Sequence, residues 1–164
     1  MNNNIPDSKG HNAFKRDKSF EKLMEFYCGK KLFNKIKPQF IKLGELIGGK
    51  IEDLTLTADK SPPQLIKRTR AGVNVDRIIK HPDFCSLEKI AFSDFGLAAI
   101  SHKNKIFGFE EKLPPIIKYG LTFLFVQSEF GLCCPISMTD SLTRTLSKFG
   151  NKDLIKLFFD KLTS

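Results

Sequence analysis

Two adjacent cysteines, Cys133 and Cys134, precede Pro135 and form the part of the sequence that most resembles a reactive site. Both thiols cannot easily hold one metal ion from a helix, because neighbouring side chains point about 100° apart around the helix axis. A cysteine nucleophile needs a base and a group that orients this base, and the sequence places neither beside the pair. We therefore interpret the two cysteines as buried thiols that pack at the start of a helix.

A series of small hydroxyl side chains follows Pro135 at alternate positions. The series consists of Ser137, Thr139, Ser141, Thr143 and Thr145. Such residues are unusual in a helix, because their side chains compete for the backbone hydrogen bonds. Two interpretations stay open: the helix has a solvated face, or it lines a polar cavity in which small hydroxyls let a ligand approach closely.

Two short matches to nucleotide-binding motifs fail on their context. The segment "GELIGGKI" at 44–51 fits a phosphate-binding loop, but Ile51 stands where a hydroxyl must reach magnesium, and a helix-like pattern precedes it instead of a strand. The segment "SDFG" at 93–96 lacks any other kinase signature, so we expect a helix end capped by Gly96. His81, which precedes Pro82, is expected to cap a helix and not to bind metal. The sequence predicts no catalytic residue and no metal site.

The composition favours one soluble domain with a real core. The 164 residues are 41% hydrophobic and 27% charged, and no apolar run approaches the roughly 20 residues that span a membrane. The N-terminus lacks the apolar core of a secretory signal, so we expect a cytoplasmic protein with free cysteines. The net charge of +9 permits an anionic partner such as nucleic acid, although the excess lysines are scattered.

The first half of the chain predicts a flexible tail and then helices. Residues 1–17 are polar and predict the tail, so the packed domain is expected over 18–164. Apolar residues then recur at helical spacing, which predicts two short helices that meet at Pro38 and a further break at Gly48 and Gly49. Two extended stretches on either side of "RAG" predict a short β-hairpin near residues 65–79.

The second half predicts further helices. One starts at Pro82, one at Pro114 and Pro115, and one near Pro135, where Ser137 and Asp140 are spaced like a capping box. The last two helices carry wide apolar stripes for which this sequence offers no cover. The stripe residues are Met138, Leu142, Leu146, Phe149, Leu154, Ile155, Leu157, Phe158, Phe159 and Leu162. We predict a mainly α fold, a helical bundle with one short hairpin.

Three segments resemble one protein family. The segment "SLTRTLSKFGNKDLIKLFFDKLTS" at 141–164 resembles the end of the N-terminal helical domain of acyl-CoA dehydrogenases. Residues 61–97 and "SEFGLCCPISMT" at 128–139 are similar to the alkylation-response, or adaptive-response, members of that family. The resemblance covers residues 20–164.

The resemblance implies a domain of a larger flavoprotein. In the family, FAD is held mainly by a later β-domain and a C-terminal helical bundle, which also supply the flavin loop and the catalytic glutamate. This chain is therefore expected to be inactive alone and to form one wall of the acyl and flavin cavity. The residues that match this wall are Cys134, Pro135, Ser137, Met138 and Thr139.

Several partners are compatible with the resemblance and the charge. The expected partners are the flavin β-domain and the C-terminal bundle, or a second copy that covers the apolar face. Two alternative functions stay open: a basic helical module that binds nucleic acid, and the interaction subunit of a split flavoenzyme. The first would bind more weakly as salt rises.

Overall fold

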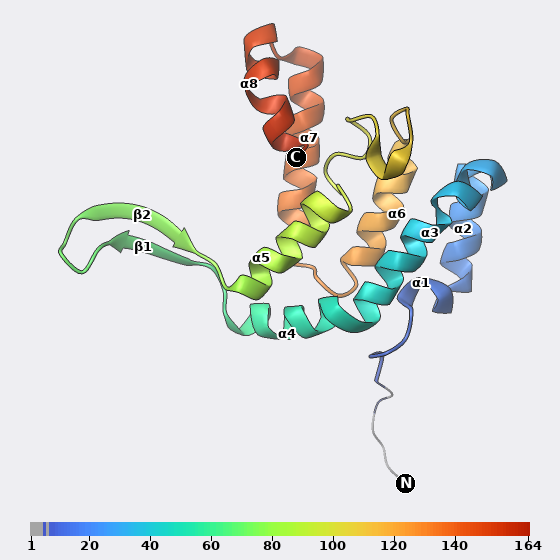
Figure 1. Cartoon of the computed structure of the whole chain (residues 1–164), viewed down its shortest axis with the longest axis horizontal. Coiled ribbons are helices and arrows are strands. Elements are labelled where there is room, and N and C mark those ends of the chain that lie inside the picture. The colour runs from blue at the N-terminus through green and yellow to red at the C-terminus, as the bar shows by residue number, and fades with distance from the viewer. Residues whose placement is uncertain (1–4, 6) are drawn as a thin grey trace.

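The computed structural model describes residue 5 and residues 7–164 (Figure 1). In chain order the elements are α1 Ala13–Arg16, α2 Lys18–Cys28, α3 Lys30–Leu46, a π-helical turn Ile47–Ile51, α4 Glu52–Lys60, β1 Gln64–Arg68, β2 Asn74–Ile79, α5 Pro82–Glu88, a π-helical turn Lys89–Asp94, a 3-10 turn Ile106–Gly108, α6 Pro115–Phe125, α7 Cys133–Phe149 and α8 Lys152–Leu162. The predicted mainly α fold with one hairpin is confirmed.

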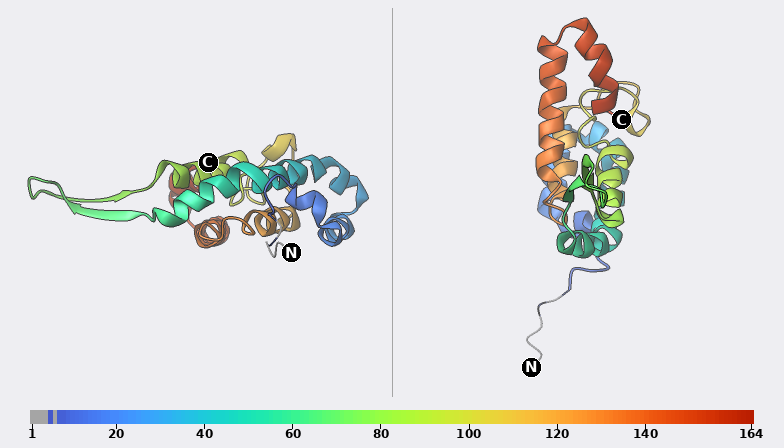
Figure 2. Two further views of the ribbon diagram at one scale, coloured as in Figure 1. Left: turned by 90° about the horizontal axis from the view of Figure 1, so that it is seen from below. Right: turned by 90° about the vertical axis from the view of Figure 1, so that its left-hand side faces the viewer.

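The helices form two layers around an aromatic core. In Figure 2, α2, α6 and α7 lie in one layer, while α3, α4 and α5 lie in the other. Between them, Phe14, Phe33 and Phe40 are fully buried, and the rings of Phe14 and Phe40 have centroids 5.3 Å apart. The last helix, α8, packs along α7 and contributes no fully buried residue.

The packed part of the chain begins before residue 18. Asn12 caps α1 by accepting a hydrogen bond from the backbone N–H of Lys15, and its amide donates to the carbonyl of Ile41 at 2.8 Å. Phe14 then enters the core with no exposed surface. The prediction of a tail through residue 17 overlooked this segment, because one aromatic residue in a polar stretch gives little periodic signal.

Two glycines of the long helical segment make room for this N-terminal stretch. A Cβ atom at Gly44 would lie 2.7 Å from the backbone nitrogen of Phe14, and one at Gly48 would lie 2.8 Å from the carbonyl carbon of His11. The backbone N–H of Gly10 also donates to the carbonyl of Gly48 at 2.6 Å. Only glycine permits these approaches between the two backbones.

We expect Gly48→Ala to destabilise the protein by about 1–3 kcal/mol, because backbone atoms cannot yield as a flexible side chain can. The neighbouring Gly49 provides the matched control, since a Cβ there meets nothing within 4 Å. Gly49→Ala is expected to be neutral or to stabilise by about 0.5 kcal/mol. Urea unfolding of both variants measures the difference, and equal stabilities would contradict the backbone contact.

Two predicted helix breaks do not occur. Pro38 lies inside α3 and points to solvent, so the carbonyl that loses its helical donor can bond to water. Gly48 and Gly49 lie in the π-helical turn that joins α3 to α4 without interruption. The phosphate-loop match at 44–51 is therefore helical, as the preceding pattern indicated.

The predicted hairpin is confirmed and projects away from the helices (Figures 1 and 2). The strands are antiparallel, with Leu65 opposite Ile78 and Arg68 opposite Asn74. The register shifts between these pairs, where Asp76 adopts a positive φ of 40°, which marks a β-bulge. Among the strand residues only Ile66 is partly buried.

The remaining helices begin near the predicted positions. His81 caps α5 through its Nδ1, which accepts from the backbone N–H of Asp83 at 3.2 Å, as predicted. Gly96 adopts the positive φ of 55° expected after a helix end. Asn151 caps α8. Within the described residues, no helix has the length and apolar character to cross a membrane.

Candidate functional site

The start of α7 is fixed by a buried carboxylate. Glu129 is 3% exposed, and its Oε1 accepts from the backbone N–H of Leu132 at 3.1 Å. Its Oε2 accepts from the Oγ1 hydroxyl of Thr55 on α4 at 3.4 Å. The predicted capping box is wrong, because α7 begins at Cys133 and places Ser137 one turn inside the helix.

Helix α7 has an inward and an outward face. Ile136 and Thr143 are buried, and the Thr143 hydroxyl donates to the carbonyl of Thr139 at 2.7 Å. On the opposite side, Met138 and Leu142 are 66% and 53% exposed. The apolar stripe predicted for this helix is therefore its outward face.

The five predicted wall residues lie together near the start of α7. Cys134, Pro135, Ser137 and Met138 are exposed, and Thr139 is half-buried. Their side chains offer a thiol, a hydroxyl and apolar surface to solvent. In this chain four of the five therefore lie on an open surface.

The interpretation of Cys133 and Cys134 as buried packing thiols is wrong for Cys134, which is exposed. Cys134 and Cys85 are exposed, whereas Cys28 and Cys133 are partly buried, and all four are free. Burial raises the pKa of the Cys28 thiol above its usual value. Within the described part of the chain, no three His, Cys, Asp or Glu side chains are grouped to hold a metal ion.

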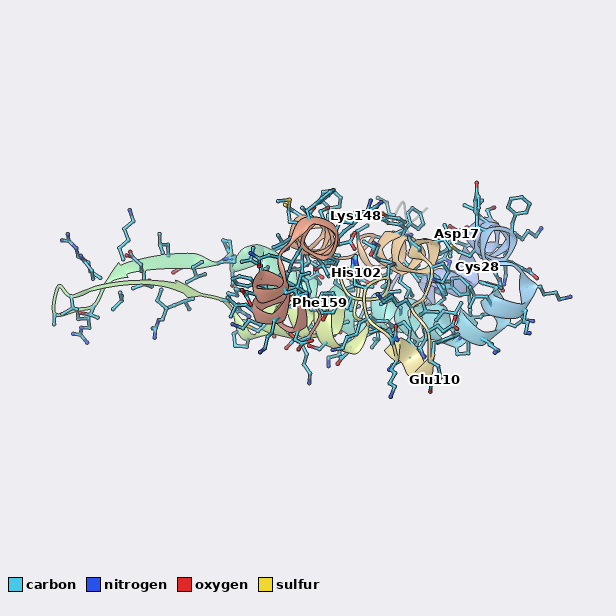
Figure 3. The ribbon with its side chains drawn as sticks, turned by 90° about the horizontal axis from the view of Figure 1, so that it is seen from above. Asp17, Cys28, His102, Glu110, Lys148 and Phe159 are labelled. Carbon is cyan, nitrogen blue, oxygen red and sulfur yellow. The ribbon has the colours of Figure 1, made fainter. Side chains whose placement is uncertain are left out.

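The inward face of α7 carries a polar cluster that the sequence reasoning missed. The Oδ1 of Asp140 accepts from Lys118 Nζ on α6 at 2.6 Å and lies 2.7 Å from His102 Nε2. All three side chains are at most 15% exposed. In Figure 3, His102 lies inside the molecule. The cluster connects α7 to α6 and to the loop that carries His102.

A signal for this cluster was present in the sequence. Asp140 stands four residues after Ile136 and three before Thr143, which is the spacing of one helix face. Lys118 interrupts an otherwise apolar helix. Since a buried charge needs a partner, the lysine and the aspartate could have been paired. The lysine and the histidine contact the same carboxylate oxygen, so the cluster holds α7 against α6 and the loop that carries His102.

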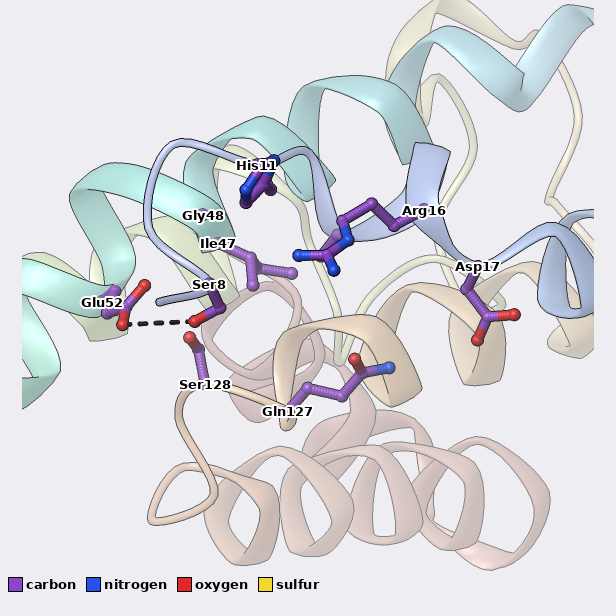
Figure 4. A pocket seen from close by; sticks show the side chains of 10 residues that line it. Ser8, His11, Arg16, Asp17, Ile47, Gly48, Glu52, Gln127 and Ser128 are labelled. Carbon is purple, nitrogen blue, oxygen red and sulfur yellow. Dashed lines mark hydrogen bonds between the residues drawn. The ribbon is translucent and has the colours of Figure 1, made fainter. Parts of the chain in front are cut away.

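A polar hollow lies on the side where the N-terminal segment meets the π-helical turn (Figure 4). It has a volume of about 490 Å³, and the Arg16 side chain points into it between Ile47 and Gln127. Ser8 donates to Glu52 at its rim at 3.5 Å. This hollow contains none of the predicted wall residues.

The helical arrangement defines the class of protein. It superimposes on Bd2924 in its apo form with a TM-score of 0.84 at 21% identity, covering 98% of this chain and 31% of that one. It superimposes on Caenorhabditis elegans ACDH-11 in complex with C11-CoA with a TM-score of 0.82 at 22% identity, covering 100% of this chain and 28% of that one. The fold is that of the N-terminal domain of acyl-CoA dehydrogenase-like proteins.

The sequence identifies the particular family. Residues 3–164 match the adaptive response protein AidB N-terminal domain, so the chain belongs to that family. Over 157 residues it is 24% identical to acyl-CoA dehydrogenase family member 11 of C. elegans. The aligned region covers 94% of this chain and 25% of the relative. The chain thus spans about a quarter of the curated relative's length, and the predicted resemblance is confirmed.

Proposed function

We propose that the outward face of α7 forms one wall of an acyl and flavin cavity that the remaining domains of an acyl-CoA dehydrogenase-like flavoprotein complete. The observation that carries this proposal is the exposure of Cys134, Pro135, Ser137 and Met138 on one helix. Met138 continues along α7 into the exposed Leu142 and Phe149, and a contiguous exposed apolar surface favours a protein or ligand contact. The chain alone is proposed to be inactive.

The wall residues can contact both an apolar acyl chain and the polar groups attached to it. Met138 and Pro135 offer apolar surface to an acyl chain, and the Ser137 hydroxyl offers one donor and two acceptor sites. FAD, when bound by the other domains, would supply the redox chemistry. An acyl-CoA thioester is the proposed substrate class, in line with the C11-CoA bound to the relative ACDH-11.

A second exposed apolar area supports docking of those domains. On α2 and α6, in the same layer as α7, side chains line an apolar hollow of about 210 Å³. The hollow is lined by Phe20, Leu23, Met24, Tyr27, Ile116, Tyr119, Gly120 and Phe123. Tyr119 and Phe123 are about half exposed, so a partner that fills the hollow would gain apolar burial.

The test supplies the flavin β-domain and the C-terminal bundle as a separate polypeptide. We expect the chain alone to retain no FAD and to oxidise no acyl-CoA with an artificial electron acceptor. Mixed with the second polypeptide, it is expected to form a one-to-one complex by gel filtration and to increase the retained FAD absorbance. A yellow flavin complex or turnover with the chain alone would contradict the proposal.

The location of the protein is a prediction from the sequence. We propose the cytoplasm, because the four cysteines are free thiols, as they are in a reducing compartment. Thiol-trapping in intact cells, followed by fractionation, would test this location.

A further inference from the structure

The hairpin β1–β2 projects away from the helices (Figure 1), and all of its strand residues except Ile66 are exposed. Leu65 and Ile78 are 54% and 61% exposed. A two-stranded hairpin without a third strand or a packed face is marginally stable in water. The exposed strands therefore present both apolar surface and free backbone groups along their edges.

Both faces of the hairpin carry apolar and cationic side chains, and the register places both strand arginines on the same face. Residues opposite each other share a face, and successive residues alternate. Leu65 and Ile78 therefore share one face with Val75 and Lys67, and we call it the apolar face after its three apolar residues. Arg68 and Arg77 lie on the other face, together with Ile66 and Ile79, and we call it the cationic face after its two arginines. There Arg68 Nε donates to Asn74 Oδ1 at 3.1 Å.

The hairpin concentrates positive charge. Within 64–79, the four cations Lys67, Arg68, Arg70 and Arg77 stand against the single carboxylate of Asp76. The hairpin thus carries +3 of the chain's net charge of +9 in sixteen residues. None of these four cations makes an ion pair within the part of the chain that the structure describes.

We propose that the hairpin is a docking ribbon for an extended, acidic protein segment in which apolar and carboxylate side chains alternate. Such a segment adds a third strand, extends the apolar face with its apolar residues and places its carboxylates beside Arg68 and Arg77. Both features of the hairpin are then used. The hairpin is a separate surface from the proposed wall on α7.

Two other kinds of partner would match fewer features of the hairpin. A nucleic acid would engage the cationic face but would leave the apolar face in water. A second copy of the hairpin would bring arginines of like charge next to one another, which destabilises strand pairing. Charge complementarity therefore favours the acidic segment.

The test uses the full chain and a fluorescein-labelled eight-residue peptide of alternating Val and Glu. We expect saturable binding by fluorescence anisotropy at 50 mM NaCl and weaker binding at 300 mM, since salt screens exposed charges. A peptide of alternating Val and Lys is expected to bind at least about tenfold more weakly, because like charges then face each other. Equal binding of both peptides, or no binding, would overturn the proposal.

Charge reversal gives a sharper outcome. The double variant Arg68→Glu/Arg77→Glu is expected to lose the Glu peptide and to gain the Lys peptide. The matched control, Lys22→Glu/Lys30→Glu, changes the net charge equally through exposed lysines of α2 and α3 and should keep the original preference. Equal effects of the two double variants would reduce the binding to net charge and overturn the proposal.

The other occupants are separated by a third variant, Leu65→Ser/Ile78→Ser, and by two further probes. This variant is expected to weaken the peptide complex. If a 20-base-pair DNA duplex binds more tightly than the peptide, is lost in Arg68→Glu/Arg77→Glu and is unaffected by the serine variant, the ribbon binds nucleic acid instead. If the serine variant changes the molar mass of the chain in solution, the ribbon joins two copies instead.

Discussion

Replacing Asp140 by Asn is expected to lower the free energy of unfolding by about 3 kcal/mol. The amide keeps an acceptor oxygen but carries no charge, so the ammonium group of Lys118 stays buried without a counter-charge. The loss should affect the whole chain, because the cluster joins α6, α7 and the loop that carries His102. Urea unfolding followed by circular dichroism measures it.

Two further variants show whether the charge or the position matters. Asp59→Asn, at an exposed residue of α4, is expected to change the stability by less than about 0.5 kcal/mol. The double variant Lys118→Met/Asp140→Leu removes both charges. Its loss of unfolding free energy should be smaller than the sum of the losses measured for Lys118→Met and Asp140→Leu separately. Additive losses would contradict a coupled buried pair.

Met138→Glu is expected to weaken the complex with the flavin β-domain and C-terminal bundle by at least about 100-fold. If the outward face of α7 becomes covered, the new carboxylate loses its water without gaining a partner. In the isolated chain Met138 is mostly exposed, so the stability of this chain should be nearly unchanged. Isothermal titration with the second polypeptide measures the affinity, and retained FAD reports the completed cavity.

The control for Met138 is an equally apolar and exposed residue in the other layer. Leu56 on α4 is 58% exposed, and Leu56→Glu should leave the affinity and the retained FAD unchanged. If both variants weaken the complex equally, the wall does not lie on α7. If neither does, this face of α7 is not covered.

Local signals in the sequence were enough to predict most of the elements. Extended residues around a glycine turn predicted the hairpin, and Pro82 after His81 predicted the start and the cap of α5. These features depend on residues within one or two turns of each other. The family resemblance rested on segments of the same kind, and it was confirmed by both the family match and the fold.

The errors occurred where distant parts of the chain meet. Gly48 looked like a helix break, yet it serves as the place where the backbone of His11 approaches the helix. Phe14 looked like part of a tail because its neighbours are polar. Asp140 looked like a cap, but its partners Lys118 and His102 lie 22 and 38 residues away. Local periodicity alone does not report contacts over such separations, although the single lysine in the apolar helix α6 signalled that a buried partner was needed.

For the candidate wall, too, the local feature could be predicted and the long-range contact could not. The resemblance placed Cys134, Ser137 and Met138 on one helix, and the structure puts them on its exposed side. Their proposed role at a cavity requires further domains of a longer protein.

The reactivity of two cysteines tests the cavity wall most directly. Cys134 on α7 and Cys85 on α5 are both exposed and free, so both should react readily with a small alkylating reagent in the isolated chain. After addition of the flavin β-domain and C-terminal bundle, peptide mass spectrometry should show slow alkylation at Cys134 and unchanged alkylation at Cys85. Undiminished alkylation of Cys134 in a stable complex would contradict the assignment of α7 as the wall.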